Sequence, residues 1–424
     1  MNYKKVNYPI FFLTILPLSI ILGSSISLIN IVLLSLFFIP EYFKNSKPKL
    51  YDRNTLIAFV ILYVYLIFNS LISIDYMSGF FRNVGFLRFI FFFLMINLIF
   101  FKYGKNNYLF KFWTAIFLIV IIDIYIERLT GSNLLGYGKM QINGVAQPDG
   151  ARIVSFFKDE PIAGAFATGF IFIVFGYLFD TSKKNKNSIK IFILFIMLLS
   201  LIGILITGER SNTIKAFLGI TLFFLLTDFF KWRTKLISLL AFFMIIATIV
   251  YYSDYLQYRY IGSLFSELKT KENRSQFIKK RSQYIKLYRS GISVFKNYPI
   301  LGVGNKNYRL ESCDKEKNKE NIDYHCLTHP HQVYIELLSE HGIFGTVIIL
   351  SIIFYLLFRL LKQIIQSQNH LQIGTFIFIL INFIPLLPSG SFFSDFNLSL
   401  FMINFSLMYA INKETNIFSK KNGI

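Results

Sequence analysis

Apolar runs recur along almost the whole length of this 424-residue chain, and short basic loops separate them. A run of about 20 apolar residues is what an α-helix needs to cross the hydrocarbon core of a bilayer. Because 54% of the residues are hydrophobic and 18% are aromatic, the chain has more apolar surface than one soluble core of this length would bury. The pattern therefore predicts an all-α polytopic membrane protein. About twelve spans are expected, at 9–23, 26–40, 55–74, 86–101, 112–126, 161–179, 190–207, 213–230, 236–252, 343–361, 373–388 and 398–411.

The formal net charge of +21 raises the possibility of an anionic partner such as nucleic acid. The positions of the charges argue against nucleic acid, because the basic clusters fall at every second end of successive spans. This is the positive-inside pattern of membrane proteins, and it predicts that both termini are cytoplasmic. The clusters on the inner side are Lys4/Lys5, Lys44/Lys47/Lys49/Arg53, Lys102/Lys105/Lys111, Lys183/Lys184/Lys186/Lys190, Lys231/Arg233/Lys235, Arg359/Lys362 and Lys413/Lys420/Lys421.

The same topology divides the chain into three parts. Residues 1–252 supply nine spans, with an outer loop at 127–160. Residues 253–342 form a long, partly helical outer loop, and residues 343–424 supply the last three spans and a cytoplasmic tail. Long loops are exempt from the positive-inside rule, so the basic charge of the 253–342 loop needs another explanation.

Histidines gather just before the tenth predicted span: His325, His329, His331 and His341. Pro330 suits the first turn of a helix and Gly342 suits the position after the last turn, which predicts a short helix over 330–341. His331 would then lie in the first turn, where the helix dipole disfavours the imidazolium form. A neutral imidazole is the form that a general base requires, so His331 is the candidate catalytic residue.

Charged residues also stand near the outer ends of other predicted spans. Glu209 and Arg210 share a tight turn after the seventh span, and Arg152 and Glu160 end the loop before the sixth. An arginine at such a position is often only an interfacial anchor. Glu160 precedes Pro161, so its carboxylate is expected to stabilise the start of the sixth span, or else to orient an acceptor.

The long outer loop begins with helically spaced basic residues, among them Arg281 and Arg289, and a further arginine follows at Arg309. A solvated basic helix face is one interpretation. A cradle for a diphosphate is the other, because guanidinium groups bind phosphate oxygens in pairs.

Cys313 and Cys326 are the only two cysteines, and both lie in this loop. In an oxidising compartment they are expected to form a disulfide that closes the segment 314–325. A zinc site with His325 and His329 is the alternative, but the spacing does not match a standard zinc motif. No metal and no cofactor are expected.

The stretch His331-Gln332, nine residues, Gly342, two residues and Gly345 resembles the signature of the O-antigen ligases. The Gly208-Glu209-Arg210 turn, the 152–160 segment and the 299–309 stretch resemble other landmarks of the O-antigen ligase and polymerase superfamily, in the same order along the chain.

This resemblance implies a GT-C-like helical fold in the bacterial inner membrane, with a metal-independent site at its periplasmic face. Members of the superfamily transfer a glycan from undecaprenyl diphosphate to an acceptor. Carried over by motif, His331 resembles the catalytic histidine and Arg210 an essential arginine. Arg281 is the best match for a second diphosphate-binding arginine, and Arg289 and Arg309 are the next candidates.

Three functions remain open at this point. A ligase would pass the finished glycan to lipid A-core, and the His-Gln-nine-Gly spacing favours this reading. A polymerase would pass a growing chain to a new repeat unit on undecaprenyl diphosphate. A polytopic transporter fits the topology alone, but it would place its charged groups at mid-membrane rather than at the outer ends of spans.

Overall fold

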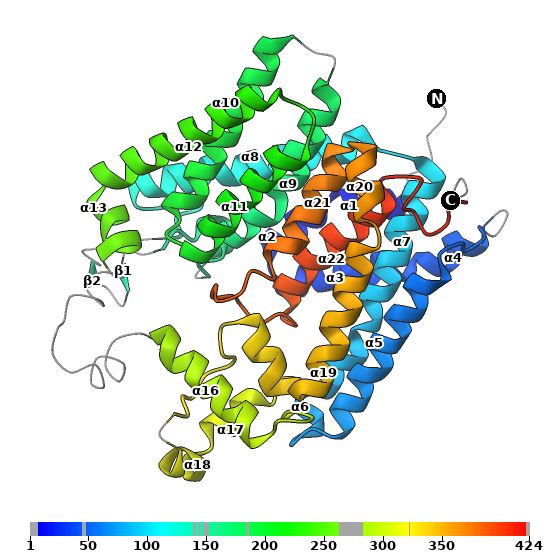
Figure 1. Cartoon of the computed structure of the whole chain (residues 1–424), viewed down its shortest axis with the longest axis vertical. Coiled ribbons are helices and arrows are strands. Elements are labelled where there is room, and N and C mark those ends of the chain that lie inside the picture. Colours follow the sequence, from blue (N-terminus) through cyan, green and yellow to red (C-terminus); the bar gives the residue numbers. More distant parts are fainter. Residues whose placement is uncertain are drawn as a thin grey trace.

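The computed structural model describes residues 7–44, 48–138, 141–142, 145–146, 152–158, 160–183, 186–262, 283–321 and 323–420. These residues are mainly helical, and their only strands are β1 (Gln141–Ile142) and β2 (Val145–Ala146), which form one antiparallel pair. Figure 1 shows a bundle of long helices with shorter helices gathered at one end. The all-α class predicted from the apolar runs is confirmed.

The bundle contains α1 (Tyr8–Thr14), α2 (Leu16–Leu22), α3 (Ser24–Leu36), α4 (Phe38–Phe43), α5 (Arg53–Leu71), α7 (Leu87–Tyr103), α8 (Asn107–Thr130), α9 (Ala163–Ser182), α10 (Asn187–Ile206), α11 (Arg210–Leu226), α12 (Trp232–Tyr252), α19 (Val333–Phe358), α21 (His370–Ile381) and α22 (Asp395–Ala410). The remaining helices are α6 (Tyr76–Gly85), η1 (Ser155–Phe157), α13 (Asp254–Leu256), η2 (Gln257–Gly262), α16 (Gln283–Asn297), α17 (Tyr308–Cys313), α18 (Lys315–Glu320) and α20 (Leu361–Ser367).

Eight helical segments within the described residues are long and apolar enough to cross a membrane. They are α3–α4, α5, α6–α7, α8, α9, α10, α12 and α19–α20. The other four predicted spans coincide with the shorter helices α1–α2, α11, α21 and α22. The protein is therefore a multi-pass membrane protein.

The eleventh span is shorter in the structure than the sequence predicts. It is expected to reach residue 388, but α21 ends at Ile381, and the chain then runs without a helix to α22. Pro385 and Pro388 explain the difference, because proline lacks an N–H and disfavours helical backbone at the residue before it. The freed segment 382–394 folds back over the start of α19, where the histidines lie.

The two ends of the bundle differ. At one end, here called the terminal end, the Ile417 carbonyl accepts hydrogen bonds from the N–H groups of Tyr51 and Asp52, and Asp52 pairs with Arg359 at 3.0 Å. At the other end, here called the loop end, lie α6, α13 and α16–α18 (Figure 1). Every charged residue proposed from the sequence for the site, where the structure describes it, belongs to segments at the loop end.

The centre of the bundle is the close contact between α9 and α21. A side chain at Gly176 would meet the backbone of Leu371 at 2.6 Å, and one at Gly374 would meet the Phe172 carbonyl oxygen at 2.3 Å. Helices in a bilayer gain little from burying apolar surface against each other, so small residues that allow close van der Waals packing stabilise their association. This packing gives the loop end a rigid base.

Candidate active site at the loop end

His331 lies just before α19 rather than inside it. The helix begins at Val333, and the Gln332 side chain caps it by accepting a hydrogen bond from the Ile335 N–H at 2.8 Å. His331 has a φ of 57°, in the left-handed region, so the prediction that it occupies the first turn is wrong. The polar Gln332 is the better N-cap, since its side chain satisfies an N–H that the helix leaves unpaired.

The ring of His331 packs against the ring of His329, with the two centroids 3.9 Å apart. Partial burial lowers the pKa of His331 below its usual value, and the nearby charge of Arg152 lowers it further. Burial lowers the pKa of His329 to about 3, with smaller contributions from His331 and Lys306. Both rings are therefore neutral at neutral pH, and the neutral form of His331 has a different cause from the helix dipole expected for it.

The backbone around the histidines is tied to the segment 382–394. The His331 carbonyl accepts a hydrogen bond from the Ser389 N–H at 2.9 Å. The buried Glu336 accepts from the Ser391 hydroxyl at 2.5 Å and from the Phe392 N–H at 3.0 Å. Because these hydrogen bonds join the segment 382–394 to His331 and to α19, they fix the backbone of His331 relative to the segment that leads into α22.

The two glycines after the histidines are required by packing. Gly342 has a φ of 61° and interrupts α19, as expected for the end of a short helix. A side chain there would meet the Ile300 carbonyl oxygen at 2.3 Å, and one at Gly345 would meet the Tyr65 hydroxyl at 1.6 Å. His341, between these glycines and the site, is buried and bonded to the same Tyr65 hydroxyl at 3.1 Å, which is a packing role.

Three arginines from distant parts of the chain lie near one another at the loop end, and one of them, Arg152, lies near His331. Arg210 is the first residue of α11, and Arg152 precedes η1. Arg259, in η2, donates a hydrogen bond to the Gly208 carbonyl at 2.8 Å. Burial lowers the pKa of Arg259, and the positive charges of Arg152 and Arg210 lower it further. The charge of Arg152 thus acts on Arg259 and on His331, so Arg152 links the group of arginines to the imidazole.

Arg259 was not predicted for this site. The basic residues predicted for the site in the long loop all lie after residue 262, whereas Arg259 lies in the short segment that follows the ninth span. The sequence signal for this segment is that Arg259 and Tyr260 stand four and five residues after Tyr255, a helical spacing. Tyr260 bonds Thr213 at 2.8 Å and the Leu205 carbonyl at 2.9 Å, which fixes η2 on α10 and α11.

Glu209 supports the arginines and caps a neighbouring helix. Its carboxylate accepts hydrogen bonds from the Gly164 N–H at 2.6 Å, the Ala165 N–H at 3.2 Å and the Asn212 amide at 2.6 Å. These N–H groups belong to the first turn of α9, where negative charge is favourable. Glu160 is exposed, so the expectation that it stabilises this helix start is wrong. The carboxylate comes from a residue that is distant in sequence.

The segment that carries Arg152 is held by acidic residues of α8. Glu127 accepts hydrogen bonds from the N–H groups of Val154 and Ser155 at 3.1 and 2.6 Å, and Asp123 accepts from the Ser155 hydroxyl at 2.6 Å. Arg152 itself is exposed and makes no hydrogen bond or ion pair within the described part of the chain. Its guanidinium is therefore free to contact a ligand.

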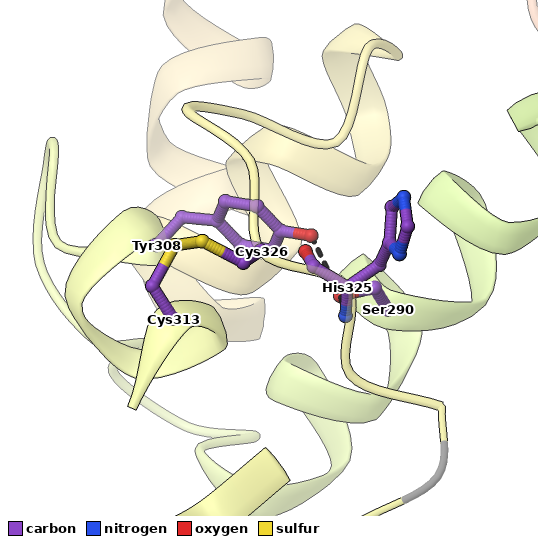
Figure 2. The surroundings of a disulfide bond; sticks show 5 residues. All are labelled: Ser290, Tyr308, Cys313, His325 and Cys326. Atoms are coloured by element: carbon purple, nitrogen blue, oxygen red, sulfur yellow. Dashed lines mark hydrogen bonds between the residues drawn. A yellow bond between two sulfur atoms is a disulfide. The ribbon is translucent and has the colours of Figure 1, made fainter. Parts of the chain in front are cut away.

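Cys313 and Cys326 form a disulfide in the structure. Figure 2 shows Tyr308, Ser290 and His325 beside it. The Ser290 hydroxyl accepts hydrogen bonds from the Tyr308 hydroxyl at 2.7 Å and the His325 N–H at 3.0 Å. The disulfide thus joins α17 to the segment that leads to His329 and His331. In this bonded state the two sulfur atoms are not thiolate ligands for zinc.

The other arginines proposed for the diphosphate are not brought to His331 by any described contact. Arg281 lies outside the described residues. Arg289 is on the exposed face of α16, whereas Gly291 on the adjacent face packs against Pro330 and Ile335. Arg309 lines a separate cleft.

Residues 195–350 match the family model described as O-antigen ligase. This region belongs to the O-antigen ligase and polymerase superfamily. A search of curated protein sequences returned no match. The match to the O-antigen ligase family indicates an O-antigen ligase-like membrane glycosyltransferase.

The O-antigen ligase region contains Arg210, Arg259, His329 and His331. Arg152 lies before it, and the segment 382–394 that holds the histidines lies after it. The candidate site of this O-antigen ligase-like protein is therefore completed by parts of the chain outside the matched region.

Proposed function

We propose that the protein is an inverting, metal-independent glycosyltransferase that moves a glycan from undecaprenyl diphosphate to lipid A-core, as an O-antigen ligase does. The observation that carries this proposal is the grouping of a neutral His331 with Arg152, Arg210 and Arg259 at one end of a membrane bundle. The family match supports the reaction class.

The arginines would stabilise the leaving group. When the bond between the sugar C1 and the phosphate oxygen breaks, undecaprenyl diphosphate leaves as an anion, and fixed positive charges lower the energy of that transition state. Arg152 and Arg210 have no hydrogen bond or ion pair with other described side chains, so both can contact phosphate oxygens. Arg259 contributes positive charge from its position against Gly208.

His331 would act as the general base. The acceptor hydroxyl forms the new bond to C1 and gives its proton to a nitrogen of the His331 ring, while the diphosphate leaves from the opposite face. One displacement inverts the configuration at C1. Because the pKa of His331 is lowered, the ring is ready to accept a proton at neutral pH.

The membrane arrangement follows from the same proposal. The loop end would face the periplasm, where a disulfide such as Cys313–Cys326 is stable. The terminal end, with both chain termini, would face the cytoplasm of a bacterial inner membrane, in line with the positive-inside pattern.

The test uses purified protein in detergent with an undecaprenyl-diphosphate-linked glycan and lipid A-core. His331→Ala should abolish transfer. The matched control is His325→Ala, because His325 is an exposed histidine of the same loop whose described contacts are made by its backbone. Transfer by His331→Ala at the rate of the unchanged protein would overturn the assignment. Transfer in detergent also excludes transport as the sole activity, since no second compartment is present.

The second candidate is a polymerase of the same superfamily, and the choice of acceptor separates the two. A ligase attaches the glycan to lipid A-core and does not lengthen the donor. A polymerase lengthens glycans on undecaprenyl diphosphate when lipid A-core is omitted. Product sizes on a gel distinguish these outcomes.

A further inference from the structure

A second basic site lies at the loop end, between α6 and the segment before α17. It is a cleft of about 620 Å³, lined by Ser78, Arg82, Lys306, Arg309 and Leu310. This volume is in the range of sites that hold small ligands or headgroups. Nothing in the proposed transfer reaction has used this cleft.

The charges that line the cleft are available to an anion. No hydrogen bond or ion pair within the described residues involves the side chains of Lys306 and Arg309. Arg82 binds the Phe393 carbonyl and lies 3.5 Å from Asp395, but Arg88 binds the same carboxylate more closely, at 2.6 Å. The acids whose charges act on Lys306 are Glu340, Glu336 and Asp395. Glu336 and Glu340 are buried in the protein, and Asp395 is paired with Arg88.

The walls of the cleft are held in place before any ligand binds. Asn305 donates to the side-chain oxygens of Asn69 and Asn83 at 2.9 and 2.5 Å, and Asn307 accepts from the Asp75 N–H at 2.8 Å. A side chain at Gly79 would meet the Asn305 carbonyl at 2.4 Å, so α6 lies directly against this segment. A site that is already ordered loses less entropy on binding.

The helix α6 places the cleft at the level of lipid headgroups. Its residues Tyr76, Met77 and Phe81 are 58, 47 and 71% exposed, whereas Gly79 and Asn83 face the protein. α6 begins the span α6–α7, and exposed aromatic residues at the end of a span are typical of the membrane interface. Figure 1 shows α6 beside the lower part of α19 and α17. The phosphates of membrane lipids are the anions found at this depth.

We propose that this cleft binds a phosphate group on the lipid-anchored acceptor. Arg309 and Lys306 would donate hydrogen bonds to the phosphate oxygens, and Arg82 would add charge from α6. That the phosphate belongs to the acceptor rests on the function proposed above. An ordinary anionic phospholipid offers the same chemical group and is the competing source.

The position of the histidine pair supports this assignment. The charge of Lys306 acts on His329, whereas the charge of Arg152 acts on His331, and the two rings touch. Each histidine of the pair is therefore near a cation of a different group. One group would hold the diphosphate of the donor, and the other would hold the acceptor so that its hydroxyl reaches His331.

The test is a comparison of two acceptors with two proteins. The acceptors are lipid A-core with its phosphates and the same lipid after enzymatic removal of them. The proteins are the unchanged chain and the double variant Lys306→Gln/Arg309→Gln, with Lys296→Gln as a control because Lys296 is exposed on α16 and does not line the cleft.

The expected result is a KM for the phosphorylated acceptor at least tenfold higher in the double variant, with the KM of the donor within twofold of the unchanged protein. The dephosphorylated acceptor should show the high KM with both proteins. Equal KM values for the two acceptors in the unchanged protein would overturn the proposal, as would an equal loss on both acceptors in the variant.

A binding measurement keeps the proposal testable if no transfer is observed, which would contradict only the proposed function. Phosphorylated and dephosphorylated lipid A-core, and phosphatidylglycerol in phosphatidylcholine nanodiscs, are titrated against both proteins. Variant-dependent binding of phosphorylated lipid A-core alone supports the assignment. Variant-dependent binding of phosphatidylglycerol that is as tight assigns the cleft to ordinary phospholipid and overturns the acceptor role.

Discussion

The rings of His329 and His331 lie with their centroids 3.9 Å apart and their planes tilted by 43°. Two imidazoles at this distance disfavour positive charge on each other. In the protein this effect adds to burial and to the charges of Lys306 and Arg152. Burial and the neighbouring cations therefore keep both rings neutral. A neutral ring suits a base that must take a proton from a hydroxyl.

The first prediction concerns the pH dependence of transfer. The pKa of His331 lies below its ordinary value of 6.5, and a general base acts only when it is neutral. The value of kcat/KM should therefore be constant near pH 7 and fall only below about pH 6.5. Arg152→Gln should move the midpoint of this fall to higher pH, because a cation that disfavours imidazolium is removed. A midpoint above pH 7 in the unchanged protein, or no movement in the variant, would contradict this account.

The second prediction concerns the arginines. Arg210→Gln and Arg259→Gln should each lower kcat by about 10²–10³-fold, the cost of removing one group that stabilises transition-state charge. Arg233→Gln is the matched control, since Arg233 is an exposed arginine at the start of α12, near the terminal end. Initial rates at saturating donor and acceptor measure the effect. A loss below threefold for Arg259→Gln would remove it from the site.

The third prediction separates two glutamates. Glu209→Gln replaces a buried carboxyl group that accepts two hydrogen bonds from the start of α9 and one from Asn212, and it should lower the free energy of unfolding by about 1–3 kcal/mol. Glu160→Gln changes an exposed side chain and should shift it by less than about 0.5 kcal/mol. Thermal unfolding of both variants in the same detergent checks the difference. Equal shifts would mean that the cap at Glu209 is unimportant.

The fourth prediction uses two glycines with nearly the same backbone. Gly342 has φ 61° and ψ −171°, and Gly104 has φ 66° and ψ −163°. An alanine at either position carries backbone strain of about 1–3 kcal/mol. Only Gly342→Ala adds a collision, with the Ile300 carbonyl, because no atom lies within 4 Å of a side chain at Gly104. The melting temperature should fall further for Gly342→Ala, and the reverse order would refute the packing argument.

The fifth prediction concerns the disulfide. Cys313 and Cys326 are 13 residues apart, and closing a loop of this size stabilises a fold by roughly 3 kcal/mol. Replacing both cysteines with serine should lower the melting temperature of the loop end. A reductant should lower it in the unchanged protein and have no effect on the double variant. An equal response of the two proteins to reductant would show that the bond does not contribute.

Much of the architecture can be predicted from the local pattern of apolar residues in the sequence. Each predicted span lies on a helix, because apolar length and the need to pair every backbone group in lipid act within one segment. His331 was accessible for a similar reason, since its spacing to Gly342 and Gly345 is a property of neighbouring residues. The end of α21 also has a local cause, because Pro385 and Pro388 prevent the apolar run from continuing as a helix.

The charged site depended on distances that no local pattern contains. Arg152, Arg210 and Arg259 come from three separate segments of the chain, and Glu209 rather than Glu160 caps α9 because the turn after α10 lies against the start of that helix. Charges in loops follow no period, so their partners depend on how helices pack and where they end. Local hydrophobicity is enough to define the spans and the histidine motif. Which guanidinium groups lie near His331, and which line a separate cleft, follows only from the folded bundle, because these contacts join segments that are distant in the sequence.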